Sequence, residues 1–481
     1  MKKKKECNYG KKIKLLIIMF SLIISSFITY KIIELDILPN KYLITSIAII
    51  LIMDIIAVIV LLLTKFNKIG YALAILNIII FFFGIYYISS ANSFLNKKFG
   101  NKKLTEENIY YVVTNKNNNY TELDIKEDIS YYKETPEIDK AFNTLSESYN
   151  IAKKEYDDII VMYNDLLNNT NMFMLVEKSS HDIVFELDKK LVRDNFEIIY
   201  EFKIETKIEK PVEPETTSKE VYNIYLAGTD FTNSLVDFNM IITINTKTNK
   251  ILITSMPRDY YIEVAGKGGR KDTLSYMGPY GINTSVKSLE NLFDIKIDYY
   301  VKMKAEVLVD LVDTIDGINY CSNMSYTTSH ALVLNTYVDK GKKLHVKKGC
   351  QHLNGIETLT VARERNAFVG RDRVRQENCR KIMLAILDRL KSTNTLIRYN
   401  DILNSLDNLY ETSLPRDVVS SFVKRTLDGS YFEIIEQSLD GSDTIDYVHL
   451  TNLKDWVMYP SESSVENAKQ KLKEIMNEND K

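Results

Sequence analysis

The segment "MIITINTKTNKILITSMPRD", Met240 to Asp259, predicts two neighbouring strands. Apolar residues alternate with polar ones on both sides of the turn from Thr246 to Asn249, which is typical of strands with one buried face. The tripeptide Pro257-Arg258-Asp259 lies at the far end of the second strand. The preceding segment, "VYNIYLAGTD", predicts a buried strand that ends at Gly228.

Helical patterns follow these strands. Apolar residues share one face of each of two predicted helices, Val286 to Phe293 and Leu308 to Ile315. Asp316-Gly317 then turns the chain into a further strand, "INYCS". The mixture of strands and helices predicts an α/β domain with a central mixed sheet. We assign residues 221–481 to it, including the helix predicted in "TSLPRDVVSSFVKRTL", because no linker separates that helix.

Three long apolar runs lie near the N-terminus: Leu15 to Tyr30, Leu43 to Leu63, and Ile69 to Ile88. Each is close to the roughly 20 residues that a helix needs to cross a bilayer. We therefore assign residues 1–90 to a basic tail and three transmembrane helices.

Basic residues predict how these helices are oriented. Lysines precede the first run and flank the connection between the second and third, whereas "ELDILPN" after the first run contains no Lys or Arg. The positive-inside rule then places the N-terminus in the cytoplasm and the rest of the chain after Ile88 outside it. The lysines that follow the third run argue in the opposite direction.

Residues 91–208 predict a small extracytoplasmic α/β accessory domain. Its predicted strands are "IYYVVTN", "IVFEL" and "FEIIYEFKI", arranged around a long helix from Glu137 to Leu167. The segment from Glu209 to Glu220 contains two prolines and mostly polar residues, so we expect a linker there.

Arginines are concentrated in "ARERNAFVGRDRVRQENC", Ala362 to Cys379, at positions 363, 365, 371, 373 and 375. Arginine binds phosphate through paired, charge-assisted hydrogen bonds. On an extended segment, Arg363 and Arg365 would point to one face, as would Arg373 and Arg375. A solvated charge run partnered by Glu364, Asp372 and Glu377 explains the same pattern. Nucleic acid is disfavoured as a partner by the predicted location and by the balance of 62 basic and 64 acidic residues.

Two further sets of residues could carry chemistry. Asp230 follows one strand and Asp237 opens the next, and Mg²⁺ typically takes one or two carboxylates and completes its shell with water and phosphates. Acids at strand ends are also common without a metal. Cys321 and Cys350 would pair in an oxidising compartment, but two free thiols fit the sequence as well. Cys379 falls on an apolar helical face, which predicts a small buried side chain.

Taken together and in order, these segments resemble the LytR-CpsA-Psr family of bacterial envelope proteins. The matching segments are "AGTD" with Asp237, "ILITSMPRDYYIEV", "YGINTSVKSLENLFDIKIDYYVKM", "LVDLVDTIDGI", "KKGCQHLNGIETLTVARERNAF" and "DRVRQEN". The resemblance runs from about Tyr222 to Leu390.

The resemblance implies a multi-pass protein of the bacterial cell membrane whose C-terminal domain transfers a phospho-glycopolymer. The donor would be a polyprenyl pyrophosphate-linked glycan and the acceptor a sugar hydroxyl of peptidoglycan. The resemblance implies Mg²⁺ binding by Asp230 and Asp237, which match the metal-binding aspartates of the family. It also implies pyrophosphate binding and catalysis by the residues that match the arginines of the family motifs, Arg258, Arg363, Arg365 and Arg375. The two predicted helices after residue 285 would line a slot for the lipid, although ordinary core packing explains them too.

Three positions depart from the family pattern. Leu235 stands where an arginine is common, Thr273 where a lysine is common, and Cys379 where a glutamine is frequent. Lys271 is close enough to Thr273 to replace the missing lysine in substrate binding. The departures leave open an alternative function, a binder or regulator of lipid-linked envelope precursors with little or no transferase activity.

Overall fold

A computed structural model describes residues 2–63, 67–100, 105–168, 172–207, 219–230, 234–332, 341–390, 410–429 and 431–479. The predicted linker, residues 209–220, lies outside these ranges except for its last two residues. The chain forms two compact units, one of residues 1–102 and 414–431 and the other of residues 103–413 and 432–481.

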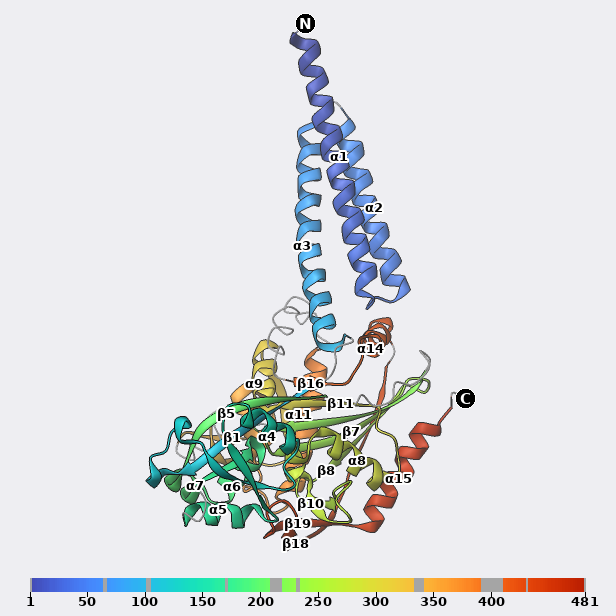
Figure 1. Cartoon of the computed structure of the whole chain (residues 1–481). Coiled ribbons are helices and arrows are strands. Elements are labelled where there is room, and N and C mark those ends of the chain that lie inside the picture. The colour runs from blue at the N-terminus through green and yellow to red at the C-terminus, as the bar shows by residue number, and fades with distance from the viewer. Residues whose placement is uncertain are drawn as a thin grey trace. The chain divides into compact units, whose positions relative to one another are not determined.

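The first unit contains the three predicted apolar helices, α1 (Lys2–Leu35), α2 (Asn40–Leu62) and α3 (Asn67–Phe99) (Figure 1). All three are long and apolar enough to cross a membrane, and most of their large apolar side chains are exposed, as expected for side chains that face lipid.

A fourth helix, α14 (Arg416–Asp428), belongs to this unit, so residues 221–481 do not form one compact body. Arg416 donates hydrogen bonds to the carbonyls of Glu34 and Leu35, and Lys424 pairs with Asp36. The positive charges of Arg416 and Lys424 stabilise the unpaired carbonyls at the C-terminal end of α1. These contacts explain why α14 joins the first unit.

The second unit begins with a five-stranded sheet in the order β3-β2-β4-β1-β5. Its strands are β1 (Thr105–Asn115), β2 (Glu127–Tyr132), β3 (Ile151–Tyr156), β4 (Phe173–Glu177) and β5 (Phe196–Lys207). Its helices are α4 (Ile138–Ser146), α5 (Ile159–Leu167), α6 (Lys178–Leu187) and α7 (Lys189–Asn195). The predicted small α/β fold is present here.

Two predicted elements in this region are wrong. The long helix from Glu137 to Leu167 is two helices separated by β3, because Asp158 accepts hydrogen bonds from two backbone N–H groups and starts α5 anew. The predicted strand "IVFEL" lies in α6, where the Glu177 carboxylate accepts from the N–H groups of Ser179 and Ser180. Such a cap favours a helix over a strand.

A six-stranded mixed sheet follows, in the order β16-β11-β6-β7-β8-β17. Its strands are β6 (Val221–Thr229), β7 (Val236–Asn245), β8 (Lys250–Met256), β11 (Tyr299–Lys304), β16 (Tyr410–Thr412) and β17 (Glu433–Ser438). The predicted hairpin is confirmed: Asn245 pairs with Lys250, and Asn249 in the turn adopts the left-handed conformation with φ 53°. The predicted central mixed sheet is therefore present.

Helices cover both faces of this sheet (Figure 1). One face packs its Tyr225, Ile241 and Leu252 with α8 (Ile282–Phe293) and α15 (Glu462–Asn477), and the opposite face packs Leu226 and Met240 with α11 (Asp372–Leu390). Helices α9 (Ala305–Thr314) and α10 (Gly355–Arg363) precede α11. The buried cluster on the α8 side also includes residues of the accessory sheet, so the two sheets share a hydrophobic core.

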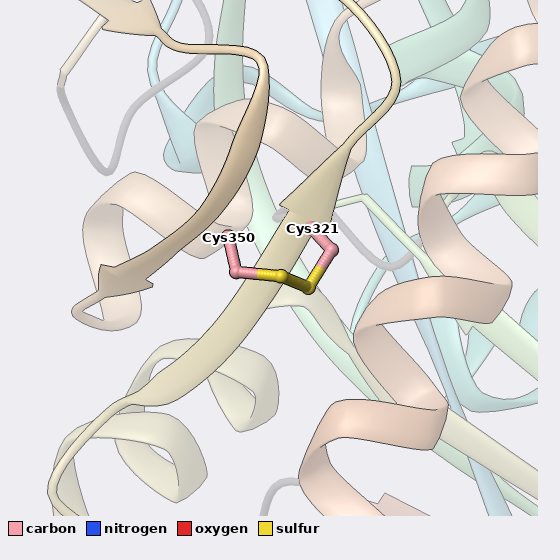
Figure 2. Close-up of a disulfide and its surroundings, with 2 residues drawn as sticks. All are labelled: Cys321 and Cys350. Atoms are coloured by element: carbon pink, nitrogen blue, oxygen red, sulfur yellow. A yellow bond between two sulfur atoms is a disulfide. The ribbon is translucent and has the colours of Figure 1, made fainter.

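Short strand pairs complete the unit. They are β9 (Tyr261–Glu263) with β10 (Lys271–Thr273), β12 (Ile318–Ser322) with β15 (Gly349–Leu353), β13 (Tyr326–Ala331) with β14 (Lys343–Val346), and β18 (Gly441–Val448) with β19 (Leu453–Pro460). Cys321 and Cys350 lie directly opposite each other on β12 and β15 and form a disulfide (Figure 2).

Candidate active site

A β-bulge at the end of β6 and the start of β7 presents Asp237. Gly228 pairs with Phe238, but the next residue, Thr229, pairs with Val236, so Asp237 is the additional residue of the bulge. Bulges redirect side chains and are frequent beside active sites. Gly228 suits this close approach, because a Cβ atom there would lie 2.9 Å from the Cβ of Phe238.

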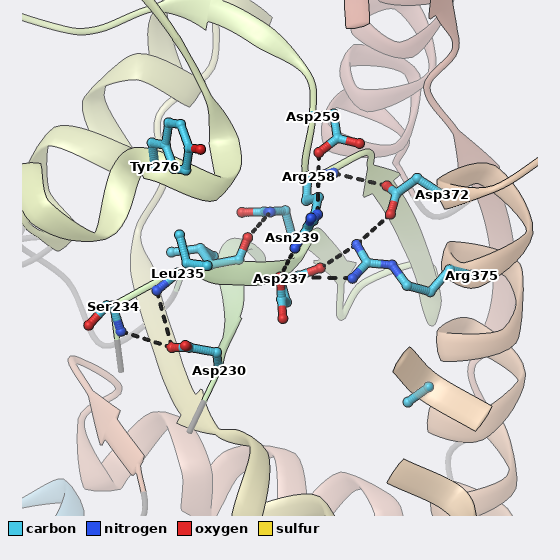
Figure 3. A network of polar contacts seen from close by, with 12 residues as sticks. Asp230, Ser234, Leu235, Asp237, Asn239, Arg258, Asp259, Tyr276, Asp372 and Arg375 are labelled. Atoms are coloured by element: carbon cyan, nitrogen blue, oxygen red, sulfur yellow. Dashed lines mark hydrogen bonds and ion pairs between the residues drawn. The ribbon is translucent and has the colours of Figure 1, made fainter. Parts of the chain in front are cut away.

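Asp230 lies beside this bulge and is held by the backbone (Figure 3). Its Oδ1 atom accepts hydrogen bonds from the N–H groups of Ser234 (2.9 Å) and Leu235 (3.1 Å). Both Asp230 and Asp237 line the same cavity. The two carboxylates that the resemblance assigns to Mg²⁺ therefore border one cavity.

Arg258, which follows β8, is the centre of the polar network in Figure 3. Its Nη1 lies 2.5 Å from Asp237 Oδ1, and its Nε lies 3.3 Å from Asp259 Oδ1. The backbone N–H of Arg258 donates to Asp372 Oδ2 at 3.1 Å. Two carboxylates thus pair with this guanidinium, and a third fixes the backbone of Arg258.

Arg375 approaches from the first turns of α11. Its Nη2 donates to the carbonyl of Asp237 at 2.7 Å and pairs with Asp372 Oδ1 at 2.6 Å. Only 5% of its side chain is exposed. Its Nε has no hydrogen-bond acceptor among the residues that the structure describes. This buried guanidinium therefore retains a donor for a ligand.

The paired arginines do not share faces as an extended segment would require. Arg363 is the last residue of α10 and lines the cavity with Asp230 and Asp237, whereas Arg365 lies in the turn beyond it and lines a different cavity with Arg258. Arg373 and Arg375 are two apart on a helix, where that spacing turns side chains away from each other. The same-face prediction is wrong because these residues are at a helix end and within a helix.

Opposing charges control the ionisation of this cluster. Burial tends to raise the pKa of Asp237, but the guanidinium groups of Arg258, Arg375 and Arg365 outweigh it and hold this pKa below its ordinary value. The pKa of Arg365 is lowered, chiefly by the neighbouring positive charge of Arg258. Two guanidinium groups that repel each other are stabilised by an anion placed between them.

An apolar cavity of about 250 Å³ opens beside the two aspartates and Arg375. Its apolar lining comes mainly from α9, α10 and α11, and includes Leu308, Leu311, Leu359, Ile382, Met383 and Ile386. Of the two helices predicted to line a lipid slot, only the one near Leu308 lines this cavity. Leu289 and Phe293 of the other are buried in the core on the α8 side of the sheet.

A second, polar cavity of about 160 Å³ shares Arg258 with the network. It is lined by Arg365, by Tyr276 and by the carboxylates and tryptophan of the β18–β19 hairpin. Sequence reasoning did not select Asp259, Asp372 or Trp456 as site residues. Asp259 belongs to the Pro-Arg-Asp segment and Asp372 to the arginine-rich segment. Their proximity in the sequence to the predicted anion-binding arginines could have identified both as site residues.

Lys271 is placed apart from the arginines. Its Nζ lies 6.0 Å from the ring centroid of Tyr261 and 5.8 Å from that of Tyr459. It is not among the residues that line the two cavities, whereas Thr273 lines the polar one. The structure therefore brings together Asp230, Asp237, Arg258, Arg363, Arg365 and Arg375, but not Lys271.

A comparison with known families decides the classification. The model of the LytR-CpsA-Psr family matches residues 192–474, more than half of the chain. The chain belongs to this family.

Relatives within the family include two transferases. The chain is 28% identical over 193 residues to the polyisoprenyl-teichoic acid–peptidoglycan teichoic acid transferase TagU of Bacillus anthracis. The matched region covers 40% of this chain and 59% of that relative. It is 25% identical over 236 residues to TagU of Bacillus subtilis strain 168, and this match covers 48% of this chain and 72% of that relative. The chain thus spans less than two thirds of the first of these relatives. The crystal structure of B. subtilis TagV is similar at 22% identity and a TM-score of 0.45, covering 55% of this chain and all of that one.

The carboxylates fit the divalent cation expected for the family. Mg²⁺ prefers oxygen ligands and commonly takes only one or two protein carboxylates, with phosphate and water completing its shell. Asp230 and Asp237 supply such a pair at one cavity, and Asp237 stays ionised. Among the described residues, no group of three or more His, Cys, Asp and Glu side chains encloses a metal, so phosphate ligands would be needed.

Of the three departures from the family pattern, Thr273 lines the polar cavity and Cys379 lines the apolar one. The Cys379 thiol donates to the carbonyl of Ala362 at 3.4 Å and lines the apolar cavity one turn after Arg375. Burial raises the pKa of Cys379 to about 12, so the side chain is a neutral thiol there. It adds no charge to the site. Leu235, the third departure, packs against the core and donates its N–H to Asp230.

Proposed function

We propose that this protein transfers a phospho-glycopolymer from a polyprenyl pyrophosphate-linked precursor to a hydroxyl group of peptidoglycan. The observation that carries the proposal is the position of the arginines: Arg258 and Arg365 line the polar cavity, Arg363 and Arg375 line the apolar one, and the Arg258–Asp237 ion pair connects the two. An isoprenoid pyrophosphate combines an apolar tail with an anion, and it matches this arrangement in both respects.

Each part of the site has a role in this reaction. The first isoprene units lie in the apolar cavity, and Arg258, Arg363, Arg365 and Arg375 bind the pyrophosphate. The acceptor oxygen forms a bond to the phosphorus attached to the sugar, while the bond from that phosphorus to the lipid phosphate breaks. Asp259, which lines the polar cavity, receives the hydroxyl proton. The arginines stabilise the charge of the departing lipid phosphate, which is the main requirement of phosphoryl transfer.

Mg²⁺ held by Asp230 and Asp237 would neutralise charge on the phosphate oxygens. The charge balance of the site supports such a cation. In the described part of the chain, six arginines and Lys304 line the two cavities together with six aspartates, so the fixed charges there nearly cancel. A divalent cation would add to the small positive excess of this lining and so favour a pyrophosphate.

We infer that the active site lies outside the cytoplasmic membrane of a bacterial cell. The three apolar helices supply a membrane anchor, and the distribution of lysines around them supports a cytoplasmic N-terminus. The Cys321–Cys350 disulfide is typical of an oxidising, extracytoplasmic compartment. Peptidoglycan is on that side. The names of the relatives support a teichoic acid as the glycopolymer.

The test is a transfer assay with the full-length protein in detergent. The protein, Mg²⁺, peptidoglycan and a labelled polyprenyl pyrophosphate-linked glycan are combined, and the release of polyprenyl phosphate is measured. Arg375→Ala should reduce the rate by at least ~100-fold, because it removes a buried anion donor. The control is Arg380→Ala on the same helix as Arg375. It removes an ion pair with Glu436 of β17 and should change the rate by less than about twofold.

The same assay distinguishes the alternative function, a non-catalytic binder of lipid-linked precursors. Cys379 favours this alternative, because a thiol lines the cavity where the family frequently has a glutamine amide. A binder would retain the lipid-linked glycan without releasing polyprenyl phosphate. Measurable release by the native chain, abolished in Arg375→Ala, excludes it.

A further inference from the structure

We propose that the polar cavity beside Arg258 and Arg365 is a saccharide-binding subsite with Trp456 as its aromatic platform. This inference rests on the proposed function, because it names where a sugar of the donor or the acceptor lies next to the reacting phosphorus. The ligand class is a pyranose ring with free hydroxyl groups.

The exposure and position of Trp456 carry the inference. The residue is in β19, lines the polar cavity and is 43% exposed. A large aromatic ring exposed inside a polar cavity offers a flat apolar face, and the C–H face of a pyranose packs on such a ring. The guanidinium carbon of Arg371 lies 5.7 Å from the indole centroid, which orients the ring.

The backbone of Arg371 supports a functional reason for this contact. Arg371 adopts φ 40°, a left-handed conformation that is costly for a non-glycine residue, and its N–H donates to the carbonyl of Phe368. Strained residues of this kind concentrate at ligand sites. Here the conformation holds a cation at the rim of the cavity and over the indole.

The polar walls of the cavity suit hydroxyl groups better than a second anion. Asp455 accepts a hydrogen bond from the Tyr276 hydroxyl at 2.5 Å, and Asp443 pairs with Arg373 at 2.9 Å. These contacts fix two carboxylates, whose remaining lone pairs accept hydrogen bonds from sugar hydroxyls. Four carboxylates balance the four arginines that line this cavity, which leaves no excess positive charge for a second anion, and the charged lining disfavours a lipid tail.

The cavity is also in the right place for the reaction. It shares Arg258 with the polar network, and Arg258 contacts Asp237, which lines the apolar cavity. A sugar here is therefore adjacent to a pyrophosphate whose lipid occupies the other cavity. The glycan that carries the acceptor hydroxyl and the glycan being transferred both meet this requirement.

Trp456 is the single tryptophan of the chain, so its fluorescence reports on this cavity alone. The full-length protein in detergent is titrated with phosphate-free muropeptides from lysozyme-digested peptidoglycan, and dextran serves as the control saccharide. We expect a saturable change in emission with muropeptides and none with dextran. Asp455→Asn should weaken the apparent affinity about tenfold, whereas Arg380→Ala should leave it unchanged. If neither muropeptides nor a short-chain lipid-linked glycan changes the emission, the subsite is contradicted.

Kinetics then identify which glycan is bound. If Trp456→Ala raises KM for peptidoglycan about tenfold and leaves KM for the lipid-linked donor unchanged, the subsite binds the acceptor. The reverse result assigns it to the transferred glycan. Trp456→Phe, which keeps an aromatic platform, should retain KM within about threefold. A loss of kcat with both KM values unchanged would overturn the proposal in favour of a structural role. Saturable fluorescence without any transfer would contradict the proposed function but not the subsite.

Discussion

At the scale of single residues, the site depends on carboxylates that hold arginines in place. Asp372 is the clearest case, because it accepts from the backbone N–H of Arg258 and from Gln376, and it pairs with Arg375. Its side chain is only 5% exposed. The aspartate thus connects two of the predicted anion-binding residues without being accessible to a large ligand itself.

Asp372→Asn should destabilise the protein by about 3 kcal/mol, because it leaves the buried charge of Arg375 partly uncompensated. The measurement is the thermal unfolding midpoint of the full-length protein in detergent. The matched control is Glu377→Gln on the same helix, which removes a partly exposed pair with Lys381 and should cost less than ~1 kcal/mol. Equal shifts in the two variants would contradict this account of Asp372.

Motifs selected most of the residues that the structure brings together at the candidate site, but they did not predict the directions of the side chains. Asp230, Asp237, Arg258 and Arg375 lie together as the resemblance implied. The directions of Arg363 and Arg365 depend on where α10 ends, and sequence reasoning did not fix that residue. Trp456 is separated from the arginine segment by about eighty residues, and only the fold brings the two together.

At the scale of secondary-structure elements, hairpins and apolar helices were predicted better than capped helices. The β7–β8 hairpin has strict alternation and a polar turn, both of which are local signals. "IVFEL" was mistaken for a strand because so short an apolar run fits both the two-residue period of a strand and the 3.6-residue period of a helix. Its helical conformation depends on Glu177, whose Oε2 atom accepts hydrogen bonds from the N–H groups of Ser179 and Ser180.

Glu177 gives α6 a pH-dependent stability. Burial raises the pKa of Glu177 to about 7 from an ordinary value of 4.5. Between these values the unfolded chain ionises this carboxyl group while the folded protein keeps it protonated, so stability falls as pH rises. Over that window the native protein should lose about 3 kcal/mol relative to Glu177→Gln, which cannot ionise.

The measurement is the difference in unfolding midpoint between the native protein and Glu177→Gln from pH 4.5 to 7. Gln keeps a carbonyl oxygen for the two backbone N–H groups of the cap. The control is Glu147→Gln, at an exposed position in the same region. A difference that does not vary with pH would show that Glu177 has the same pKa in the folded and unfolded protein, which contradicts the prediction.

At the scale of the whole molecule, one compact unit contains the three long apolar helices and the other contains both sheets. The chain leaves the second unit at residue 414 to form α14 with the first and returns at residue 432. Sequence reasoning placed this helix with the catalytic domain because proximity along the chain was its main signal. Its actual contacts depend on Arg416 and Lys424 meeting the C-terminal end of α1.

The central claim is that the pyrophosphate lies between the two cavities, with its lipid phosphate as the leaving group. Single-turnover reactions with two donors test it, one with ³²P in the phosphate attached to the sugar and one with ³²P in the phosphate attached to the lipid. The account predicts that the first label becomes covalently bound to peptidoglycan and the second remains on polyprenyl phosphate. Transfer of the lipid-side label, or retention of both labels on the donor with Mg²⁺ and acceptor present, would contradict it.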